Sequence, residues 1–296
     1  MRFGLVGTGP WATLTHGPGL AAAHGVELVG VWGRTREKAE GLSRTLGVTA
    51  YGDYDGLLSD VEAVAYAVPP DVQADLALVA ARAGKHLLLD KPVAVDVDAA
   101  RAVRDAAVDA GVASVVFFTD RFIDRSRTWF SHLANTGGWR GGWLRWFSSL
   151  QQADNPFGAS SWRQERGALW DTGPHALSTL GAALGPVTSI TAVGGEGDMV
   201  TLVLRHESGA SSTVMLSLFA PPAAAGFELA VWGESGLLHM PPRTDESFIQ
   251  PFATAAEDLV ASAVGGEPHE VDLAFGTRIV ELLADAQAQL DARPAG

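Results

Sequence analysis

The opening part of the chain alternates short apolar runs with longer helix-like runs, and this repetition constrains the fold more than any other feature. The apolar runs, which we expect to be strands, are Phe3–Val6, Glu27–Val31, Val61–Val68, His86–Leu89 and Ser114–Phe118. They are continuous rather than alternating in polarity, as is typical of strands covered on both faces. The helix-like runs end in glycine, which closes a last helical turn well. This pattern predicts βαβ units and a doubly wound parallel sheet, an α/β Rossmann domain, over residues 1–118.

The remainder of the chain, residues 119–296, follows a different pattern. Apolar side chains alternate with others through Val200–Leu204, Ser212–Phe219 and Phe227–Trp232, as expected for antiparallel strands with one better-buried face. Helical runs are expected at Gly158–Leu184, Phe252–Val264 and Leu273–Leu290. We therefore predict a C-terminal α+β domain with a large, predominantly antiparallel sheet, for substrate binding and oligomerisation.

The open face of this sheet is expected to carry apolar side chains such as Trp146, Met215 and Trp232. Exposed apolar area of this kind marks an interface, although helices or loops covering it are the alternative. We expect a homodimer or homotetramer.

Composition excludes several classes of protein. The chain has 296 residues, a formal net charge of −13 and no cysteine. The acidic balance argues against a nucleic-acid partner and against an anionic membrane surface, and the missing cysteines exclude disulfides and thiolate chemistry. The chain opens on a strand-like run without a leader, and no apolar stretch is long enough to span a membrane, so a cytoplasmic protein is expected.

A glycine-rich turn, Gly7-Thr8-Gly9-Pro10-Trp11-Ala12, follows the first expected strand and precedes a helix. In a G-x-G-x-x-A turn the first glycine permits the sharp turn, the second lets backbone approach a pyrophosphate, and the small last residue lets helix and strand pack closely. The helix N-terminus adds amide donors. An ordinary glycine turn is the alternative, but the position in a βαβ run favours a dinucleotide site.

The end of the second strand indicates which dinucleotide is bound. NAD-binding domains place an acid here, where it accepts bonds from the adenosine ribose. This chain has Gly33, Arg34 and Thr35 instead, and an arginine fork suits a 2′-phosphate. The alternative is that Thr35 only caps the next helix and the arginines are solvated. We predict NADP (NADPH) as cofactor, with NAD also possible.

The strand His86–Leu89 runs into Asp90-Lys91-Pro92. Ligands bind at the carboxyl ends of strands in open α/β sheets, so Lys91 is placed where a substrate oxygen would need stabilisation. A solvated loop lysine is the competing interpretation.

A second candidate group is Trp170-Asp171-Thr172-Gly173-Pro174-His175. If a helix begins here, Asp171 and His175 face the same side, and an acid beside a histidine suits proton transfer. The alternative makes Asp171 a helix cap and His175 a packing residue. No convincing third ligand accompanies the pair, so no metal site is expected.

Together these motifs resemble those of the Gfo/Idh/MocA family of glucose-fructose oxidoreductases and inositol dehydrogenases. The family's E-K-P motif corresponds to Asp90-Lys91-Pro92, and its D-x-G-x-H motif to Asp171–His175. Looser matches include Pro69-Pro70 after the third expected strand and Trp162-Arg163 before the second motif. Asp90 in place of glutamate and Gln73 in place of a frequent histidine depart from the family pattern and put the substrate pocket in doubt.

The resemblance implies an NAD(P)-dependent oxidoreductase acting on a polyol, a sugar, or a cyclic alcohol or carbonyl, a small-molecule substrate. It implies Lys91, Asp171 and His175 as the catalytic residues, with Trp162 and Arg163 beside the substrate and Val68, Pro69 and Asp90 beside the cofactor. The Lys91–Pro92 bond is often cis in such proteins. Two alternatives stay open: an NADPH-dependent reductase of a non-sugar carbonyl or conjugated double bond, and a catalytically silent dinucleotide-sensing regulator.

Overall fold

The computed structural model describes residues 1–150, 161–242 and 247–292. Contacts divide the chain into two compact units. The first consists of Met1–Phe122 with Ser247–Val280, and the second of Ile123–Glu246 with Glu281–Gly296. The predicted division into 1–118 and 119–296 therefore differs from this grouping in its treatment of Ser247–Val280.

The physical reason for that difference is the helix α9 (Ile249–Gly265). It packs against α1 and strand β6 of the first unit, with Phe252 fully buried there. Val271 also accepts a hydrogen bond from the Val116 amide of β6. Nothing in the helical periodicity of this segment reveals which sheet it covers.

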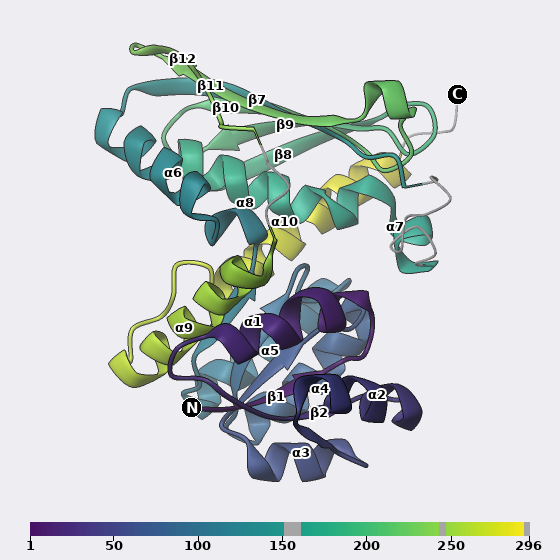
Figure 1. The fold of residues 1–296 in the computed structure, drawn as a ribbon. Helices are drawn as coiled ribbons and strands as arrows, with labels where there is room; N and C mark the ends of the chain where they lie inside the picture. The colour runs from purple at the N-terminus through teal and green to yellow at the C-terminus, as the bar shows by residue number, and fades with distance from the viewer. Residues whose placement is uncertain (151–160, 243–246, 293–296) are drawn as a thin grey trace. The chain divides into compact units, whose positions relative to one another are not determined.

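The first unit is built on a six-stranded parallel sheet in the order β3-β2-β1-β4-β5-β6 (Figure 1). Its strands are β1 (Arg2–Val6), β2 (Glu27–Trp32), β3 (Thr49–Ala50), β4 (Ala63–Tyr66), β5 (His86–Asp90) and β6 (Ser114–Phe117). The predicted α/β Rossmann class is confirmed, because every pair of neighbouring strands is parallel. The strand order reverses between β1 and β4, and ligands of such sheets bind outside the carboxyl ends at this point.

Helices connect these strands as the sequence predicts. They are η1 (Ala12–His16), α1 (Gly17–Ala22), α2 (Arg36–Leu46), α3 (Tyr54–Asp60), α4 (Pro70–Arg82), α5 (Val97–Ala110) and η2 (Thr119–Arg121). Gly47 and Gly111 end α2 and α5 in the left-handed conformation. The first helix departs from expectation, because η1 is a π-helical turn.

The second unit is built on a mixed, mostly antiparallel sheet in the order β12-β11-β7-β10-β9-β8. Its strands are β7 (Trp139–Phe147), β8 (Val187–Gly194), β9 (Val200–His206), β10 (Ser211–Ser217), β11 (Gly226–Gly233) and β12 (Gly236–His239), and η3 (Pro222–Ala224) precedes β11. Only β7 and β10 pair in parallel within this sheet as described. The predicted predominantly antiparallel sheet is confirmed.

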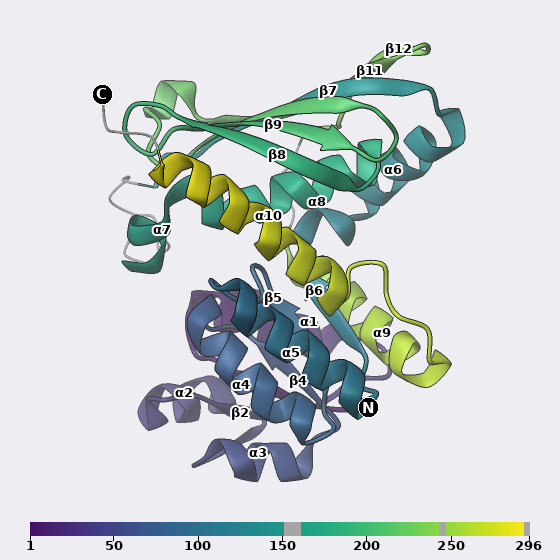
Figure 2. The same ribbon diagram turned by 180° about the vertical axis from the view of Figure 1, so that it is seen from behind.

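One face of this sheet is covered by helices, as Figure 2 shows. Helix α8 (Gly173–Leu184) packs on β7, β10 and β8, and α6 (Asp124–Thr136) packs beside α8. The end of α10 (Leu273–Asp291) follows β8, where Gln289 bonds the backbone of Ile190 and Ala192. No helix among the described residues is long and apolar enough to cross a membrane.

The other face exposes apolar side chains on three of its strands. Val203 is 44% exposed on β9, Met215 38% on β10 and Trp232 47% on β11. Trp146 was expected with them, but it contacts His175 of α8 and so lies on the covered face. The alternation that separates the two faces is visible in the sequence, whereas the face that helices cover is not.

The predicted helix Gly158–Leu184 is two helices. Residues Gly158–Ser160 lie outside the described residues, and α7 (Ser161–Asp171) ends just before α8 begins. Inside α7, Gly167 has a φ of 64° and interrupts the helical backbone. Asp171 therefore ends one helix and His175 lies in the first turn of the next.

Candidate active site

Gly7 forms the sharp turn at the end of β1, and only glycine fits there. Its φ is +123°, and a Cβ atom at this position would lie 2.3 Å from the backbone oxygen of Ala67. The Gly7 amide donates to the Trp32 carbonyl of β2 at 2.9 Å. The backbones that follow β1 and β4 thus approach too closely for any side chain.

Gly9 is a glycine for a different reason. A Cβ atom there would meet nothing within 4 Å, so the protein itself leaves the space beside this backbone open. Pro10 and Trp11 already belong to the helix that continues through the buried Ala12. A backbone without a side chain at the N-terminus of a helix fits a pyrophosphate, which the amides and the helix dipole would bind.

The end of β2 gives Gly33 a packing role. A Cβ atom there would lie 2.7 Å from Cγ2 of Thr8, so a side chain at this position would force Thr8 of the glycine-rich turn to shift. We predicted that Gly33 leaves space for a 2′-phosphate, and the contact with Thr8 is a second reason for glycine here.

Arg34 and Thr35 are exposed and available to a ligand. Thr35 stands at the N-cap of α2, but its side chain makes no capping hydrogen bond, so the interpretation of Thr35 as a cap alone is wrong. Arg36 is engaged differently, since its Nε donates to Glu40 at 2.9 Å. Val68 and Pro69 follow β4, the strand next to β1, and Pro70 opens α4.

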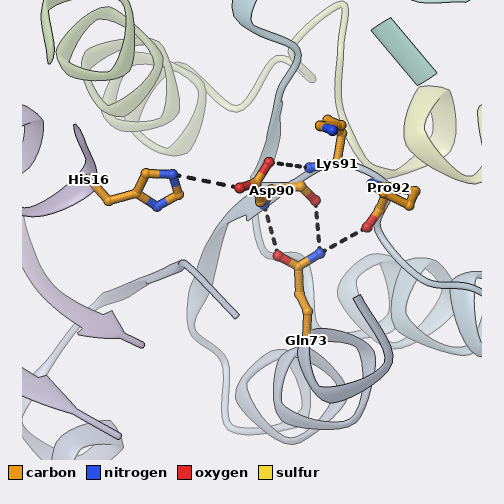
Figure 3. A network of polar contacts seen from close by, with 5 residues as sticks. All are labelled: His16, Gln73, Asp90, Lys91 and Pro92. Carbon is orange, nitrogen blue, oxygen red and sulfur yellow. Dashed lines mark hydrogen bonds and ion pairs between the residues drawn. The ribbon is translucent and has the colours of Figure 1, made fainter. Parts of the chain in front are cut away.

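Asp90 at the end of β5 is held by Gln73 of α4, as Figure 3 shows. Oε1 of Gln73 accepts a hydrogen bond from the Asp90 amide at 2.8 Å. Nε2 of Gln73 donates to the Asp90 carbonyl at 2.8 Å and to the Pro92 carbonyl at 3.3 Å. The Lys91–Pro92 peptide is cis. Gln73, a departure from the family pattern, fixes the backbone on both sides of Lys91.

The Asp90 carboxylate faces in two directions (Figure 3). One oxygen accepts the Lys91 amide at 2.7 Å, and the other lies 3.7 Å from Nε2 of His16. His16 comes from the π-helical turn η1 and is fully buried. Desolvation lowers the pKa of His16 to about 3, so the ring is neutral at ordinary pH.

The second unit holds Asp171 and His175 in largely buried positions. Oδ2 of Asp171 accepts a hydrogen bond from Nε of Arg163 at 2.9 Å, which brings two predicted site residues together. The interpretation of Asp171 as a helix cap is wrong, because Thr172 occupies the N-cap of α8 and its hydroxyl donates to Ala168. Arg163 neutralises the Asp171 carboxylate and fixes its direction.

Aromatic side chains surround His175 on the covered face of the sheet. The Trp146 ring lies 5.6 Å from the His175 ring, and Phe227 meets Trp146 edge to face at 5.3 Å. Trp170 is buried in the core and donates to Gln287, so it is not available to stack on a substrate. Trp162 is partly exposed, with the Arg163 guanidinium 6.0 Å from its ring.

The predicted site residues therefore form two groups, one in each unit. The glycine-rich turn, the residues after β2 and β4, and Asp90-Lys91 lie at the carboxyl edge of the parallel sheet. Arg163, Asp171 and His175 lie on α7 and α8. The sequence analysis did not single out His16, which lies four residues after the last residue of the G-x-G-x-x-A turn.

Comparison with known proteins identifies the family. A model described as "Oxidoreductase family, NAD-binding Rossmann fold" matches residues 1–118, and one described as "GFO/IDH/MocA C-terminal domain" matches residues 140–239. A protein of Haloferax volcanii named D-xylose 1-dehydrogenase (NADP(+)) 2 is 30% identical over 75% of this chain and 70% of its own length. The chain belongs to the Gfo/Idh/MocA family of oxidoreductases.

Other known proteins match this chain over different fractions of its length. An uncharacterized oxidoreductase of Rhizobium meliloti, ORF334, is 37% identical over 33% of this chain, and the match spans 30% of its own length. The solved structure of UDP-N-acetylglucosamine 3-dehydrogenase GnnA from Acidithiobacillus ferrooxidans superposes with a TM-score of 0.83 at 19% identity, covering 99% of this chain and 98% of that one. At this identity the superposition shows the shared fold.

The two glycines of the turn give a paired prediction. Gly7→Ala forces a side chain into a positive φ and against Ala67, so the free energy of unfolding should fall by at least about 1–3 kcal/mol. Gly9→Ala meets open space, so its unfolding midpoint in urea should match that of wild type, while its affinity for NADPH falls by about tenfold or more. Equal stability of the Gly7 variant, or unchanged NADPH binding by the Gly9 variant, would contradict these roles.

Proposed function

We propose that this protein is an NADP-dependent oxidoreductase that oxidises an alcohol or reduces a carbonyl on a polyol, a sugar or a related cyclic substrate. A bound nicotinamide would supply the hydride acceptor or donor. The observation that carries the proposal is the open backbone at Gly9 beside the helix that begins at Pro10, on the sheet edge that also bears Lys91. Family membership and the sugar dehydrogenase named above support the substrate class.

Lys91, Asp171 and His175 are the proposed catalytic residues. The Lys91 ammonium would donate to the substrate oxygen and stabilise negative charge that develops on it. His175 would take or give the hydroxyl proton, and Asp171, oriented by Arg163, would hold the substrate hydroxyl and His175. Trp162 and Arg163 would complete the substrate side, with Trp146 as an additional aromatic wall beside His175.

NADP is the proposed cofactor in preference to NAD, which the family also uses. Arg34 is exposed, and the Thr35 hydroxyl makes no capping hydrogen bond to α2. A planar guanidinium and a hydroxyl at this position suit the 2′-phosphate of NADP, and no carboxylate stands at the strand end to repel it. The NADP(+) in the name of the Haloferax relative supports the same choice.

Loss of either proposed catalytic side chain should slow turnover without loss of the cofactor. Lys91→Met and His175→Asn should each lower kcat by about 100-fold or more in NADPH consumption over a panel of sugars, ketones and polyols. NADPH affinity, followed by nicotinamide fluorescence, should stay close to that of wild type. Lys85→Met, at the opposite end of β5, is the control and should keep its turnover. Near-normal rates in Lys91→Met and His175→Asn would contradict the catalytic assignment of these two residues. If the wild type binds NADPH but turns over no substrate, a sensing regulator would be favoured instead.

Arg34→Ala should change cofactor choice. A charge-assisted hydrogen bond contributes about 1.5–3 kcal/mol, so the variant should lose NADP affinity by roughly tenfold to a hundredfold while NAD affinity changes little. Arg36→Ala is the matched control, because Glu40 already engages that guanidinium and its loss should affect neither cofactor strongly. Equal losses of NADP and NAD with Arg34→Ala would mean that the arginine only stacks on adenine.

The exposed face of the second sheet is the proposed interface between copies of the chain, as a dimer or tetramer. Val203→Glu with Met215→Glu places charges on adjacent strands of this face and should convert the oligomer into monomers in light scattering. Val108→Glu on α5, where the valine is 73% exposed, is the control and should leave the oligomer intact. A wild-type monomer at micromolar concentration would rule the interface out.

A further inference from the structure

His16 reaches its position through an unusual turn. The Gly17 amide donates to the Ala12 carbonyl, an i to i+5 bond that defines η1 as π-helical. Single π turns inside helices occur often at functional sites, because the wider turn redirects one side chain. The turn is closely packed at Gly17, since a Cβ atom there would lie 2.8 Å from the Leu46 side chain and 3.0 Å from the Ala12 oxygen.

The surroundings of His16 are aromatic and do not explain a histidine. Its ring stacks on Phe252 at 3.9 Å and meets the edge of Phe117 at 6.1 Å. Neither ring nitrogen makes a hydrogen bond of normal length and angle to the described residues, and the weaker polar contact of the ring is with the Tyr66 backbone. A buried polar atom without a partner costs about 1–3 kcal/mol, which stacking against aromatic rings does not by itself require. Packing alone therefore does not explain why a histidine occupies this position.

The nearest acidic group is the Asp90 carboxylate. Its Oδ2 lies 3.7 Å from Nε2 of His16, slightly beyond a hydrogen bond, while Oδ1 accepts the Lys91 amide at 2.7 Å. Gln73 of α4 holds the main chain at Asp90, and the Asp90 carboxylate bonds the Lys91 amide, so the orientation of this carboxylate bears on the residue that carries the lysine side chain.

We propose that His16 is a positioning residue for Lys91. Its neutral ring donates from Nε2 to Oδ2 of Asp90 when the dinucleotide site is filled, which locks the carboxylate on the Lys91 amide and fixes the direction of the lysine side chain. A shift of less than about 1 Å closes the present gap to hydrogen-bond distance. The inference rests on the proposed function, in which Lys91 stabilises the substrate oxygen.

The neutral state of His16 supports this role. Burial lowers its pKa to about 3, and the Tyr66 backbone, which acts in the opposite direction, offsets only part of that effect. A neutral imidazole keeps one N–H donor without adding charge next to the Asp90 carboxylate. The folded pKa lies below the ordinary value of 6.5, so His16 destabilises the fold as pH falls from about 6.5 toward 3.

Two substitutions separate hydrogen bonding from packing. His16→Phe keeps the stacked ring and removes the nitrogens, and His16→Gln keeps a donor near the place of Nε2. We expect His16→Phe to lower kcat by about tenfold with KM and NADPH affinity unchanged within twofold, and His16→Gln to recover most of the loss. In a Lys91→Met background His16→Phe should have no further effect on kcat. The proposal would be overturned by a normal kcat in His16→Phe or by no recovery of kcat in His16→Gln. It would also be overturned if adding His16→Phe to Lys91→Met lowered kcat by the full tenfold again.

A readout without substrate keeps this inference separate from the proposed function. Lys38, Lys85 and Lys91 are the only lysines in the sequence, so reductive ¹³C-methylation gives a simple NMR spectrum in which Lys91 is assigned from Lys91→Met. With NADPH bound, His16→Phe should shift or broaden the Lys91 signal and leave those of Lys38 and Lys85 in place. An unmoved Lys91 signal would overturn the positioning role even if the wild type is an active enzyme. A moved signal in a protein without turnover would leave the coupling intact and refute only the oxidoreductase.

Discussion

The close approach of backbone at Gly7 is the constraint on which the nucleotide half of the structure depends. A chain leaving β1 can pass the segment after β4 only without a side chain, because a Cβ atom would lie 2.3 Å from the Ala67 oxygen. This passage places the start of the first helix at the point where the strand order reverses, with Gly9 open beside it. In the proposed function this backbone would hold a phosphate before any charged residue contributes, which suits a protein with a net charge of −13.

The proposed catalytic side chains in both units are held by neighbouring side chains. Gln73 fixes the backbone of Asp90 through hydrogen bonds, and the Asp90 carboxylate in turn accepts the Lys91 amide. In the second unit Arg163 fixes Asp171, the last residue before α8. Catalytic groups work only in a narrow range of geometry, so these supporting contacts explain why residues outside the motifs matter.

The sequence predicts the elements well where periodicity and glycine positions decide them. The strands β1, β2, β5 and β6, both sheet classes and the glycine helix ends agree with expectation. Tertiary partners decide the rest. The sequence does not reveal that α9 covers β6, that Trp146 faces α8, or that Arg163 bonds the Asp171 carboxylate. The π turn at His16 also escapes a search for the regular helical period, because π turns are rare and such a search does not include them.

Transfer of hydrogen from labelled cofactor tests the central claim most directly, because it links dinucleotide binding to chemistry on a substrate. NADPH deuterated at C4 of the nicotinamide would be incubated with the protein and carbonyl compounds that include ketoses and oxidised cyclitols, and the products examined by mass spectrometry. The account predicts deuterium on the carbinol carbon of at least one sugar-like product, and no label with a Lys91→Met, His175→Asn double variant. NADPH binding without label in any product would contradict the account and leave a dinucleotide-binding protein that performs no redox reaction.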